Sequence, residues 1–401
     1  MGCNVDRWRR PGHLVGVTVD DTLALYIHWP FCLAKCPYCD FNSHVRDAIP
    51  QAKFAAALRR ELAFEAARLG PRRLTSVFFG GGTPSLMAPA TVASLIDDAT
   101  RLFAPAADLE ITLEANPTSV ELGRLREFRA AGVNRLSLGV QALNDADLRF
   151  LGRQHSAAQA LAALEFVRGE FPRVSFDLIY ARPGQALSAW RNELRQALGL
   201  AADHLSLYQL TIEPGTKFEV LHRAGAFVLP DDDDAAGLYD ATAEEAAARG
   251  LAAYEISNYA RPGAESRHNL AYWRYRDYAG IGPGAHGRVT MGGLLYATRR
   301  HRAPEVWAEL VQRQGHGETS AEPVAQADQA REALLMGLRL AEGIDRAAFA
   351  FRVGMDVESA IDAEIALAAV EAGYLTMTPA RIVATAEGRR RLDALLPRLV
   401  V

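Results

Sequence analysis

The sequence has few cysteines, no long apolar run and little net charge, and each absence excludes a class of protein. Four cysteines in 401 residues are too few for a scaffold stapled by disulfides. No apolar run approaches the roughly 18 residues of a transmembrane helix, and the polar start of the chain, broken by Pro11 and Gly12, lacks the apolar core of a secretory signal. We therefore expect a cytoplasmic protein without a transmembrane segment.

The charge balance excludes a general nucleic-acid binder. The chain carries 44 Lys and Arg against 48 Asp and Glu, a formal net charge of −4. A protein that binds nucleic acid along its backbone needs a basic surplus. We expect no nucleic-acid partner, although a local basic pocket for an anionic ligand remains compatible with this composition.

Alternating strand and helix patterns fill residues 22–225, which we interpret as the core of the protein. Strands are expected at 23–28, 76–79, 109–113, 135–140, 174–179 and 205–210, and helices at 50–69, 89–103, 119–131, 144–150, 156–169 and 186–200. Because each connection contains a helix, the sheet should be mostly parallel. The class is therefore α/β, and periodicity leaves open a doubly wound sheet or a full or partial barrel.

The remaining segments have other patterns. Residues 1–21 are expected to form an N-terminal extension whose role, with that of Cys3, is unknown. Residues 226–314 would complete the barrel, and 315–327 would be a linker. In 328–401 we expect a small winged-helix-like domain that acts as a lid or docking surface. Its expected elements are helices at 328–341, 345–352, 356–372 and 386–396, and a hairpin of 374–377 with 381–384.

Polar residues directly follow the expected strands. They are the cysteine cluster, the run Gly80-Gly81-Gly82-Thr83, Glu114, Gln141 and Asp177. Parallel strands end at a common edge, where ligands of α/β proteins gather. We therefore expect these residues, together with Arg153 from a nearby loop, to share one ligand site, although each alone could be a surface ion pair or a helix cap.

Cys32, Cys36 and Cys39 have the spacing C-x3-C-x2-C. Three thiolates can hold three corners of a [4Fe–4S] cluster and leave its fourth iron without a protein ligand. The alternatives are three free cysteines or a zinc site with a remote fourth ligand. Zinc sites usually pair one C-x2-C with a second pair, and no second pair exists here, so the spacing favours the cluster.

This spacing after a first strand resembles the radical S-adenosylmethionine (radical SAM) superfamily. The resemblance implies that Cys32, Cys36 and Cys39 ligate the cluster and that its open iron binds the amino and carboxylate groups of S-adenosylmethionine. It also implies an electron donor, since one electron from the cluster cleaves the sulfonium to a 5′-deoxyadenosyl radical. The Gly80–Thr83 run, which on its own could be a plain strand-to-helix turn, then resembles the segment that contacts the cofactor's amino group.

Further segments resemble the oxygen-independent coproporphyrinogen III oxidase family. They are Tyr26-Ile27-His28-Trp29-Pro30-Phe31-Cys32, Cys36-Pro37-Tyr38-Cys39-Asp40-Phe41, Phe79 to Ser85, Leu138 to Gln141 and Asp177 to Tyr180. The resemblance implies a partial (β/α)6 barrel of the TIM type. The residues that match the family's S-adenosylmethionine contacts are Tyr26, Tyr38, Gly81, Gly82, Thr83, Glu114, Gln141, Arg153 and Asp177. One loop departs from the family, because Ala181-Arg182-Pro183 replaces Gly-Leu-Pro and adds a charge that we expect beside Asp177.

Two features favour the HemW-type heme chaperone branch of that family. True oxidases have a further cysteine where this chain has Phe41, and His268-Asn269-Leu270-Ala271-Tyr272-Trp273 resembles the H-N-x-x-Y-W motif of the chaperones. The resemblance implies heme bound at His268 and passed to apoproteins. The alternatives are a porphyrin-biosynthesis oxidase that decarboxylates coproporphyrinogen III, and a module with a purely structural cluster. Whether the chain is an enzyme is left open.

Overall fold

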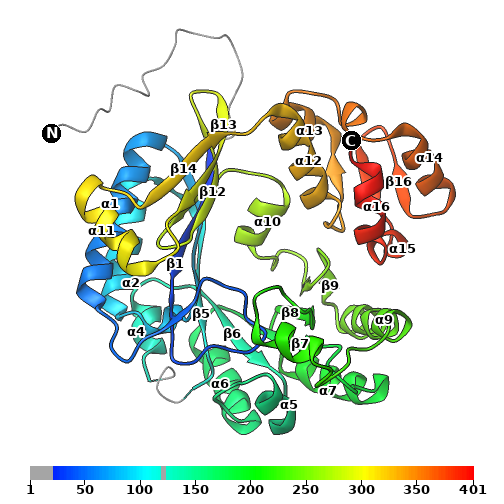
Figure 1. Cartoon of the computed structure of the whole chain (residues 1–401), viewed down its shortest axis with the longest axis horizontal. Coiled ribbons are helices and arrows are strands. Elements are labelled where there is room, and N and C mark those ends of the chain that lie inside the picture. The colour runs from blue at the N-terminus through cyan, green and yellow to red at the C-terminus, as the bar shows by residue number, and fades with distance from the viewer. Residues whose placement is uncertain (1–20, 119–122) are drawn as a thin grey trace.

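The computed structural model describes residues 21–118 and 123–401, and its main feature is one large open sheet (Figure 1). The sheet has twelve strands in the order β14-β13-β12-β11-β1-β4-β5-β6-β7-β8-β10-β9. Its parallel central strands are β11 (Tyr278–Ile281), β1 (Thr22–Trp29), β4 (Arg73–Gly81), β5 (Ala104–Ala115), β6 (Arg135–Gln141), β7 (Arg173–Tyr180) and β8 (His204–Gln209). Except for residue 21, the expected extension lies outside the described residues, as does the start of the helix expected at 119–131.

Apolar residues alternate with polar ones along the central strands, and this alternation gives the sheet two different faces. Leu25 and Ile27 of β1 belong to the main hydrophobic core, as do the register-matched Val77 and Phe79 of β4. The residues between them, such as Tyr26, point to the opposite face. That second face carries most of the buried polar and charged side chains of the strands, which are Ser76, Glu110, Thr112, Arg135, Ser175, His204 and Ser206.

Apart from the short helix α10 (Arg267–Trp273), the helices that pack on the sheet cover its apolar face, on the outside (Figure 1). They are α1 (Gln51–Leu69), α2 (Pro89–Leu102), α4 (Leu125–Ala130), α6 (Ala157–Glu170), α7 (Leu187–Leu200), α9 (Asp232–Ala248) and α11 (Pro304–Gln314). Each contributes buried side chains to the main core, and a fully buried Leu or Phe stabilises the fold by about 1.5–3 kcal/mol. A doubly wound sheet would carry helices on both faces. The fold is therefore the partial barrel, with a polar interior.

Antiparallel strands extend both edges of the sheet. They are β12 (His286–Met291), β13 (Leu294–Arg300) and β14 (Glu318–Pro323) beyond β11, and β10 (Asn258–Ala260) and β9 (Ala252–Ala253) beyond β8. The expectation of a linker at 315–327 is therefore wrong. This segment contains β14, which pairs with β13 from Tyr296↔Pro323 to Arg300↔Glu318. The strand has a polar sequence because it is an edge strand, and edge strands use charge and proline to avoid further pairing.

Several short elements shape the open edge of the barrel. They are β2 (Phe31–Cys32), β3 (His44–Val45), the 3-10 turn η2 (Pro84–Leu86), α5 (Asp145–Phe150), α8 (Lys217–Arg223) and α10 (Arg267–Trp273). Helix α10 lies on the interior side of the sheet (Figure 1), in a segment whose sequence shows little helical pattern. It begins at Ser266, whose side chain accepts a hydrogen bond from the Asn269 amide and so caps the helix.

The C-terminal elements have a hydrophobic core of their own and lie to one side of the barrel (Figure 1). They are α12 (Gln326–Gly337), β15 (Ile344–Asp345), α13 (Arg346–Val353), η3 (Val357–Ala360), α14 (Ala363–Glu371), β16 (Leu375–Met377), β17 (Arg381–Ala384), α15 (Ala386–Arg389) and α16 (Leu392–Leu399). The expected hairpin is present as β16 and β17. The helices expected at 356–372 and 386–396 are each two shorter helices, because Asp362 caps α14 and the chain turns between α15 and α16.

Polar contacts tie the C-terminal elements to the barrel. The Tyr275 hydroxyl donates to Glu332 of α12 at 2.6 Å, and Arg352 of α13 pairs with the buried Asp277 at 2.6 Å. In the part of the chain that the structure describes, no helix combines the length and the apolar character needed to cross a bilayer.

Candidate cofactor and ligand site

Cys32 ends β2, and Cys36 and Cys39 lie on the loop that leads from β2 to β3. These two short strands pair in parallel, with Phe31↔His44 and Cys32↔Val45 in register, and the loop closes with a hydrogen bond of 3.2 Å from the Cys39 amide to the Cys36 carbonyl. Cys32, Cys36 and Cys39 are unbridged and partly buried. The short strand pair therefore holds all three thiols at the carboxyl end of β1.

Each thiol has its own polar partner. Thr83 Oγ1 donates to Cys32 Sγ at 3.4 Å, and Cys39 Sγ lies 3.8 Å from Ser43 Oγ. Burial raises the pKa of the Cys32 thiol to about 11. Iron binding would therefore have to displace thiol protons. Within the described residues no three His, Cys, Asp or Glu side chains stand in a metal-binding arrangement. The soft donors on one loop fit an iron–sulfur cluster by their chemistry.

Arg153 joins the cysteine loop to the barrel interior. Its Nη1 donates to Cys36 Sγ at 3.4 Å, and its Nη2 donates to the Gly139 carbonyl at 2.6 Å and to the side chain of Asn116. Tyr38 also hydrogen-bonds Arg153 and Cys36. Arg153 Nε is buried without a partner in the described chain. A guanidinium beside the thiols favours an anionic cluster, and the unused donor is a place for a ligand carboxylate.

The glycine run packs against the start of the cysteine loop. Gly82 and Thr83 donate their amides to the carbonyls of Trp29 and Phe31 at 2.7 and 2.8 Å. A Cβ atom at Gly82 would lie 2.7 Å from the Phe31 carbonyl oxygen, and one at Gly81 would lie 2.5 Å from the His28 ring. Glycine is required here by close packing, and the same packing brings the end of β4 beside the cysteines.

Two carboxyl groups face the barrel interior, Glu114 on β5 and Asp177 on β7. Burial, with a smaller contribution from the charge of Asp177, raises the pKa of Glu114 to about 8. Burial also raises the pKa of Asp177 to about 6. Ser137 Oγ donates to Asp177 at 3.5 Å, and the Gly81 amide donates to Glu114 at 3.2 Å. Two carboxyls that resist ionisation suit a cationic ligand, because its charge would favour their ionised forms.

Gln141 ends β6 beside this group in a left-handed conformation, with φ of 72°. A Cβ at Gly139 would lie 3.0 Å from Gln141 Nε2 and 3.1 Å from Arg153 Nη2, so both side chains lie close above the strand. A residue with a side chain adopts this φ only when its surroundings enforce it, and such positions cluster at ligand sites. All the predicted S-adenosylmethionine contacts thus come from one edge of the sheet and its loops.

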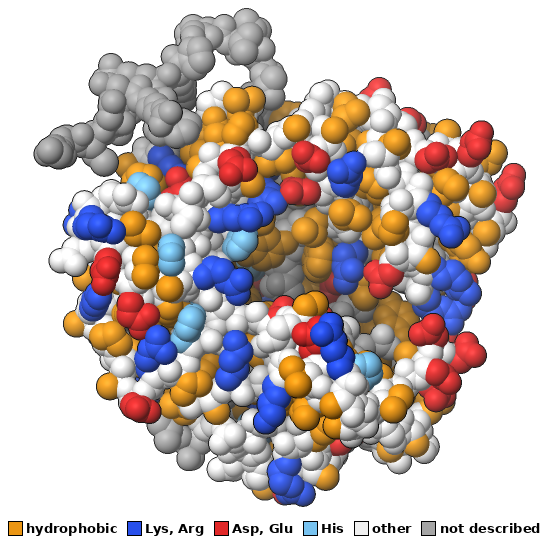
Figure 2. Space-filling view, viewed as in Figure 1, with side chains coloured by type: hydrophobic (Ala, Val, Ile, Leu, Met, Phe, Trp, Pro, Cys, Tyr) orange, Lys and Arg blue, Asp and Glu red, His pale blue; other side chains and the backbone are white. Residues whose placement is uncertain are grey.

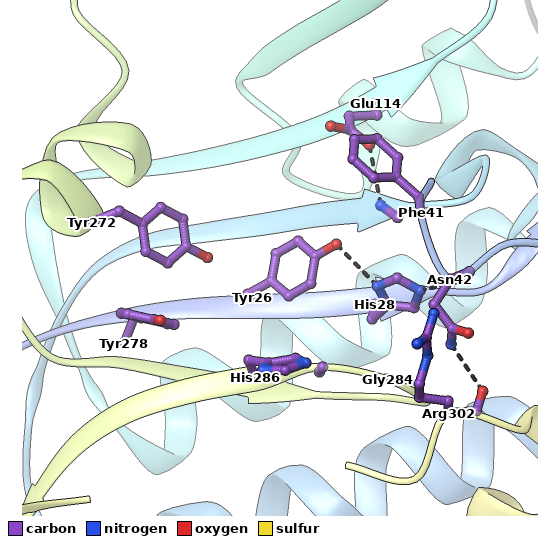
Figure 3. Close-up of a pocket in the computed structure, with 12 residues that line it drawn as sticks. Tyr26, His28, Phe41, Asn42, Glu114, Tyr272, Tyr278, Gly284, His286 and Arg302 are labelled. Carbon is purple, nitrogen blue, oxygen red and sulfur yellow. Dashed lines mark hydrogen bonds between the residues drawn. The ribbon is translucent and has the colours of Figure 1, made fainter. Parts of the chain in front are cut away.

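A cavity of about 480 Å³ opens beside these groups (Figure 3). It is lined by Tyr26, His28, Phe41, Asn42, Gly81, Glu114, Tyr272, Tyr278, Gly284, Ala285, His286 and Arg302. His28 Nε2 donates to the Asn42 carbonyl at 2.9 Å, so its Nδ1 accepts from the Tyr26 hydroxyl at 3.0 Å. Burial lowers the pKa of His28 to about 4, which keeps this ring neutral.

His268, the predicted heme contact, is buried behind the cavity wall. One ring nitrogen is hydrogen-bonded to Ser76 Oγ and the other to the Tyr272 hydroxyl, both at 2.9 Å. Its ring stacks on Phe78 with centroids 4.8 Å apart, and burial lowers its pKa to about 3. Tyr272 lines the cavity in its place (Figure 3). Heme contact by His268 remains a prediction, and here the histidine supports Tyr272.

Two arginines close to His268 in the sequence form ion pairs with carboxylates of this chain. Arg267 pairs with Asp108 at 2.5 Å and Arg274 with Glu342 at 2.7 Å. The expectation that Arg182 lies beside Asp177 is wrong. Its side chain pairs with Asp147 at 3.0 Å and with Glu193, because the preceding residue, Ala181, turns the loop away in a left-handed conformation with φ of 55°.

Sequence reasoning missed five polar or aromatic side chains of the cavity wall, which are His28, Asn42, Tyr278, His286 and Arg302. His28 lies two residues after Tyr26 on β1 and therefore on the same face of the strand, so the period of two could have predicted its place in the cavity wall. His286 directly follows the glycine-rich segment 280–285. Tyr278 and Arg302 carry no local signal, because only the pairing of β11 with β1 brings that part of the chain to the cavity.

Comparison with known proteins places the chain in a family. Residues 26–197 match the family model of the radical SAM superfamily, and 324–391 match the HemN C-terminal domain. The heme chaperone HemW of Escherichia coli (strain K12) is 38% identical over 377 residues, which cover 93% of this chain and 97% of that protein. A bovine protein named radical S-adenosyl methionine domain-containing protein 1, mitochondrial, is 45% identical over 330 residues, covering 80% and 74%.

A solved structure agrees with the fold. The coproporphyrinogen III oxidase of Escherichia coli, described as a radical SAM enzyme, superposes with a TM-score of 0.77 at 23% identity, covering 94% of this chain and 89% of that one. At that identity the match establishes the fold of barrel and C-terminal elements. With the sequence relatives, it shows that the chain belongs to the radical SAM superfamily, in the branch that contains the heme chaperone HemW.

Proposed function

We propose that this protein is a heme chaperone that binds heme and passes it to apoproteins, built on a radical SAM scaffold. The observation that carries the proposal is the composition of one cavity. Tyr26, Gly81 and Glu114 on its wall belong to the predicted S-adenosylmethionine site, and Tyr272 belongs to the segment that resembles the heme motif. The relatives named HemW cover nearly the whole chain and agree with it.

Cys32, Cys36 and Cys39 would hold the [4Fe–4S] cluster, and Arg153 would offset its negative charge. Glu114 and Asp177 would accept hydrogen bonds from S-adenosylmethionine and balance its positive charge, while the unused Nε of Arg153 would meet its carboxylate. On a reduced cluster, S-adenosylmethionine would supply a 5′-deoxyadenosyl radical. An electron donor would approach the cysteine loop, where Leu33 is 57% exposed and Phe41 is 59% exposed.

Heme is the cargo in this proposal, and the cavity offers it an aromatic wall. The rings of Tyr272 and Tyr278 lie 4.3 Å apart, edge to face. Aromatic rings bury a large apolar area against a flat macrocycle. The face shown in Figure 2 is hollowed near its centre, with hydrophobic side chains inside and basic and histidine side chains beside the opening. This arrangement suits an apolar macrocycle with acidic substituents.

A cytoplasmic location is part of the proposal. The animal relatives are named mitochondrial, so the location of this chain is a separate question, which subcellular fractionation of the source cells answers. Finding the protein with an organelle or membrane fraction would overturn this part and leave the heme proposal intact.

The experiment is a hemin titration of protein whose cluster has been reconstituted without oxygen. We expect a saturable Soret band at one heme per chain, and a weaker band in a Tyr272→Ala variant than in the control Tyr296→Ala, which changes a tyrosine that does not line the cavity. Absence of saturable binding would overturn the proposal. Anaerobic conversion of coproporphyrinogen III with release of carbon dioxide would replace it by the oxidase alternative.

A further inference from the structure

His286 differs from the other histidines near the cavity. Both ring nitrogens of His28 and of His268 are committed to hydrogen bonds. The His286 ring lines the cavity, and among residues 21–118 and 123–401 neither of its nitrogens has a hydrogen-bond partner. An uncommitted imidazole on a cavity wall is available as a ligand to iron.

The backbone fixes the position of His286. It begins β12, whose side chains alternate between the two faces of the sheet. Val289 and Met291 are buried in the main core, whereas His286 faces the barrel interior. A Cβ atom on Gly280 of the neighbouring β11 would lie 2.1 Å from the His286 carbonyl oxygen. The close approach of these strands allows little movement of the histidine backbone, so the ring is presented to the cavity by a rigid element.

Aromatic side chains flank the path from His286 into the cavity. Tyr278 comes from β11 and Tyr272 from α10, and both rings border the same space as the histidine (Figure 3). Phe41 of the cysteine loop lies across the cavity. A flat, apolar macrocycle in this cavity would have aromatic contacts, and the imidazole of His286 would face the same space.

Two arginines lie beside the same histidine. Arg302 lines the cavity, and Arg299 is the register partner of His286 on β13. Both are exposed, and neither side chain has an ion-pair partner among the residues that the structure describes. Burial, followed by the charges of Arg299, Arg288 and Arg302, lowers the pKa of His286. The ring is therefore neutral near pH 7, which is the state that binds iron.

We infer that His286 is an axial ligand to the iron of bound heme, that Arg302 and Arg299 receive its propionates, and that His268 acts only by holding the Tyr272 hydroxyl. The inference rests on the proposed heme-chaperone function and deepens it. It places the cargo on the strands beside β1, on the side of the cavity formed by β11 to β13, and leaves Glu114 and Gly81 at the other side for S-adenosylmethionine. Ligation forms one iron–nitrogen bond without oxidation or reduction.

The test compares hemin complexes of the full-length, cluster-loaded wild type with His286→Ala, His268→Ala and the control His222→Ala, which removes an exposed histidine on α8. Resonance Raman and electron paramagnetic resonance spectra report the axial ligand. We expect the histidine-ligated signature to be lost only in His286→Ala, with hemin dissociating about 10-fold faster or more. Added imidazole should restore the signature in that variant.

The outcomes separate this inference from the proposed function. If the wild type binds no hemin, the heme-chaperone proposal itself fails. If the wild type binds hemin and His286→Ala keeps the histidine-ligated signature, only the inference fails. Loss of the signature in His268→Ala with circular dichroism unchanged would assign the ligand to His268 instead. A fourth variant, Arg302→Gln, should bind protoporphyrin dimethyl ester as the wild type does but heme about 10-fold more weakly.

Discussion

Replacing Glu114 by Gln keeps the size of the side chain and removes a charge that its surroundings oppose. The pKa of Glu114 is raised from 4.5 to about 8, chiefly by burial. Between these values the folded protein holds a proton that the unfolded chain has released. Stability therefore falls as pH rises through this range, by at most about 1.4 kcal/mol per pH unit. Solvent in the cavity screens part of the effect, so we expect a cost of about 2 kcal/mol at pH 8.5.

Glu114→Gln should therefore stabilise the S-adenosylmethionine-free protein at pH 8.5 and stabilise it only about a third as much at pH 5.5. The assay is urea unfolding followed by tryptophan fluorescence at both pH values, with Glu322→Gln on the exposed edge strand β14 as the matched control. The same variant should bind S-adenosylmethionine about 10-fold more weakly, because a charge-assisted hydrogen bond is lost. A stability gain that is equal at both pH values, or larger at pH 5.5, would refute the reasoning.

Three further predictions concern other parts of the structure. Arg300→Met leaves the buried Glu61 without its cation and should lower the free energy of unfolding by about 3–5 kcal/mol. Arg299→Met, on the exposed side of the same strand, should lower it by under about 0.5 kcal/mol. Equal losses in urea unfolding would contradict this prediction. Ala181→Gly should raise the midpoint of thermal unfolding. Removing the Cβ relieves the strain of the left-handed backbone conformation, worth about 1–2 kcal/mol, and this exceeds the cost of about 0.4–1 kcal/mol from the greater entropy of the unfolded chain. A lower midpoint would show that the loop is unstrained. Arg153→Lys replaces the planar guanidinium by a single ammonium, which cannot keep the contacts with Cys36, Gly139, Asn116 and Tyr38 together. It should weaken S-adenosylmethionine binding about 10-fold or more at unchanged iron content; unchanged affinity in calorimetry would remove Arg153 from the site.

The strands and outer helices of the barrel were predictable because their patterns are local. Apolar residues such as Val77 and Phe79 recur with a period of two, and the helices between strands show helical spacing. Periodicity left the choice between barrel and doubly wound sheet open, and the structure shows which sequence feature bears on it. Thr112 and Glu114 alternate with Leu113 on β5, and such polar positions on every central strand indicate a sheet with helices on one face only.

The second half of the sheet could not be predicted in the same way. Strand β14 is polar because one of its edges is free, so its sequence resembles a linker. Helix α10 is only seven residues long, too short for a period, and its one local signal is the cap at Ser266. Short elements of this kind are specified by their tertiary contacts, here those of α10 with β4 and α12.

The candidate site was predicted where its residues follow strands, and missed where they come from distant pairing. Cys32, Cys36 and Cys39 needed only their spacing. The heme motif gave a different result, because the sequence singles out His268 while the fold buries it against Ser76. The side chain that the fold presents to the cavity instead is His286. A motif match indicates that a histidine matters, but only packing shows which neighbouring side chain it contacts.

The most direct test of the account is a measurement of heme transfer. Cluster-loaded protein carrying one heme per chain is mixed with increasing concentrations of an apo-hemoprotein, and the Soret change gives the rate of transfer. The account predicts that this rate rises with acceptor concentration, because heme passes within a complex of the two proteins. A rate that is independent of the acceptor and equal to the loss of heme to a simple scavenger would contradict it.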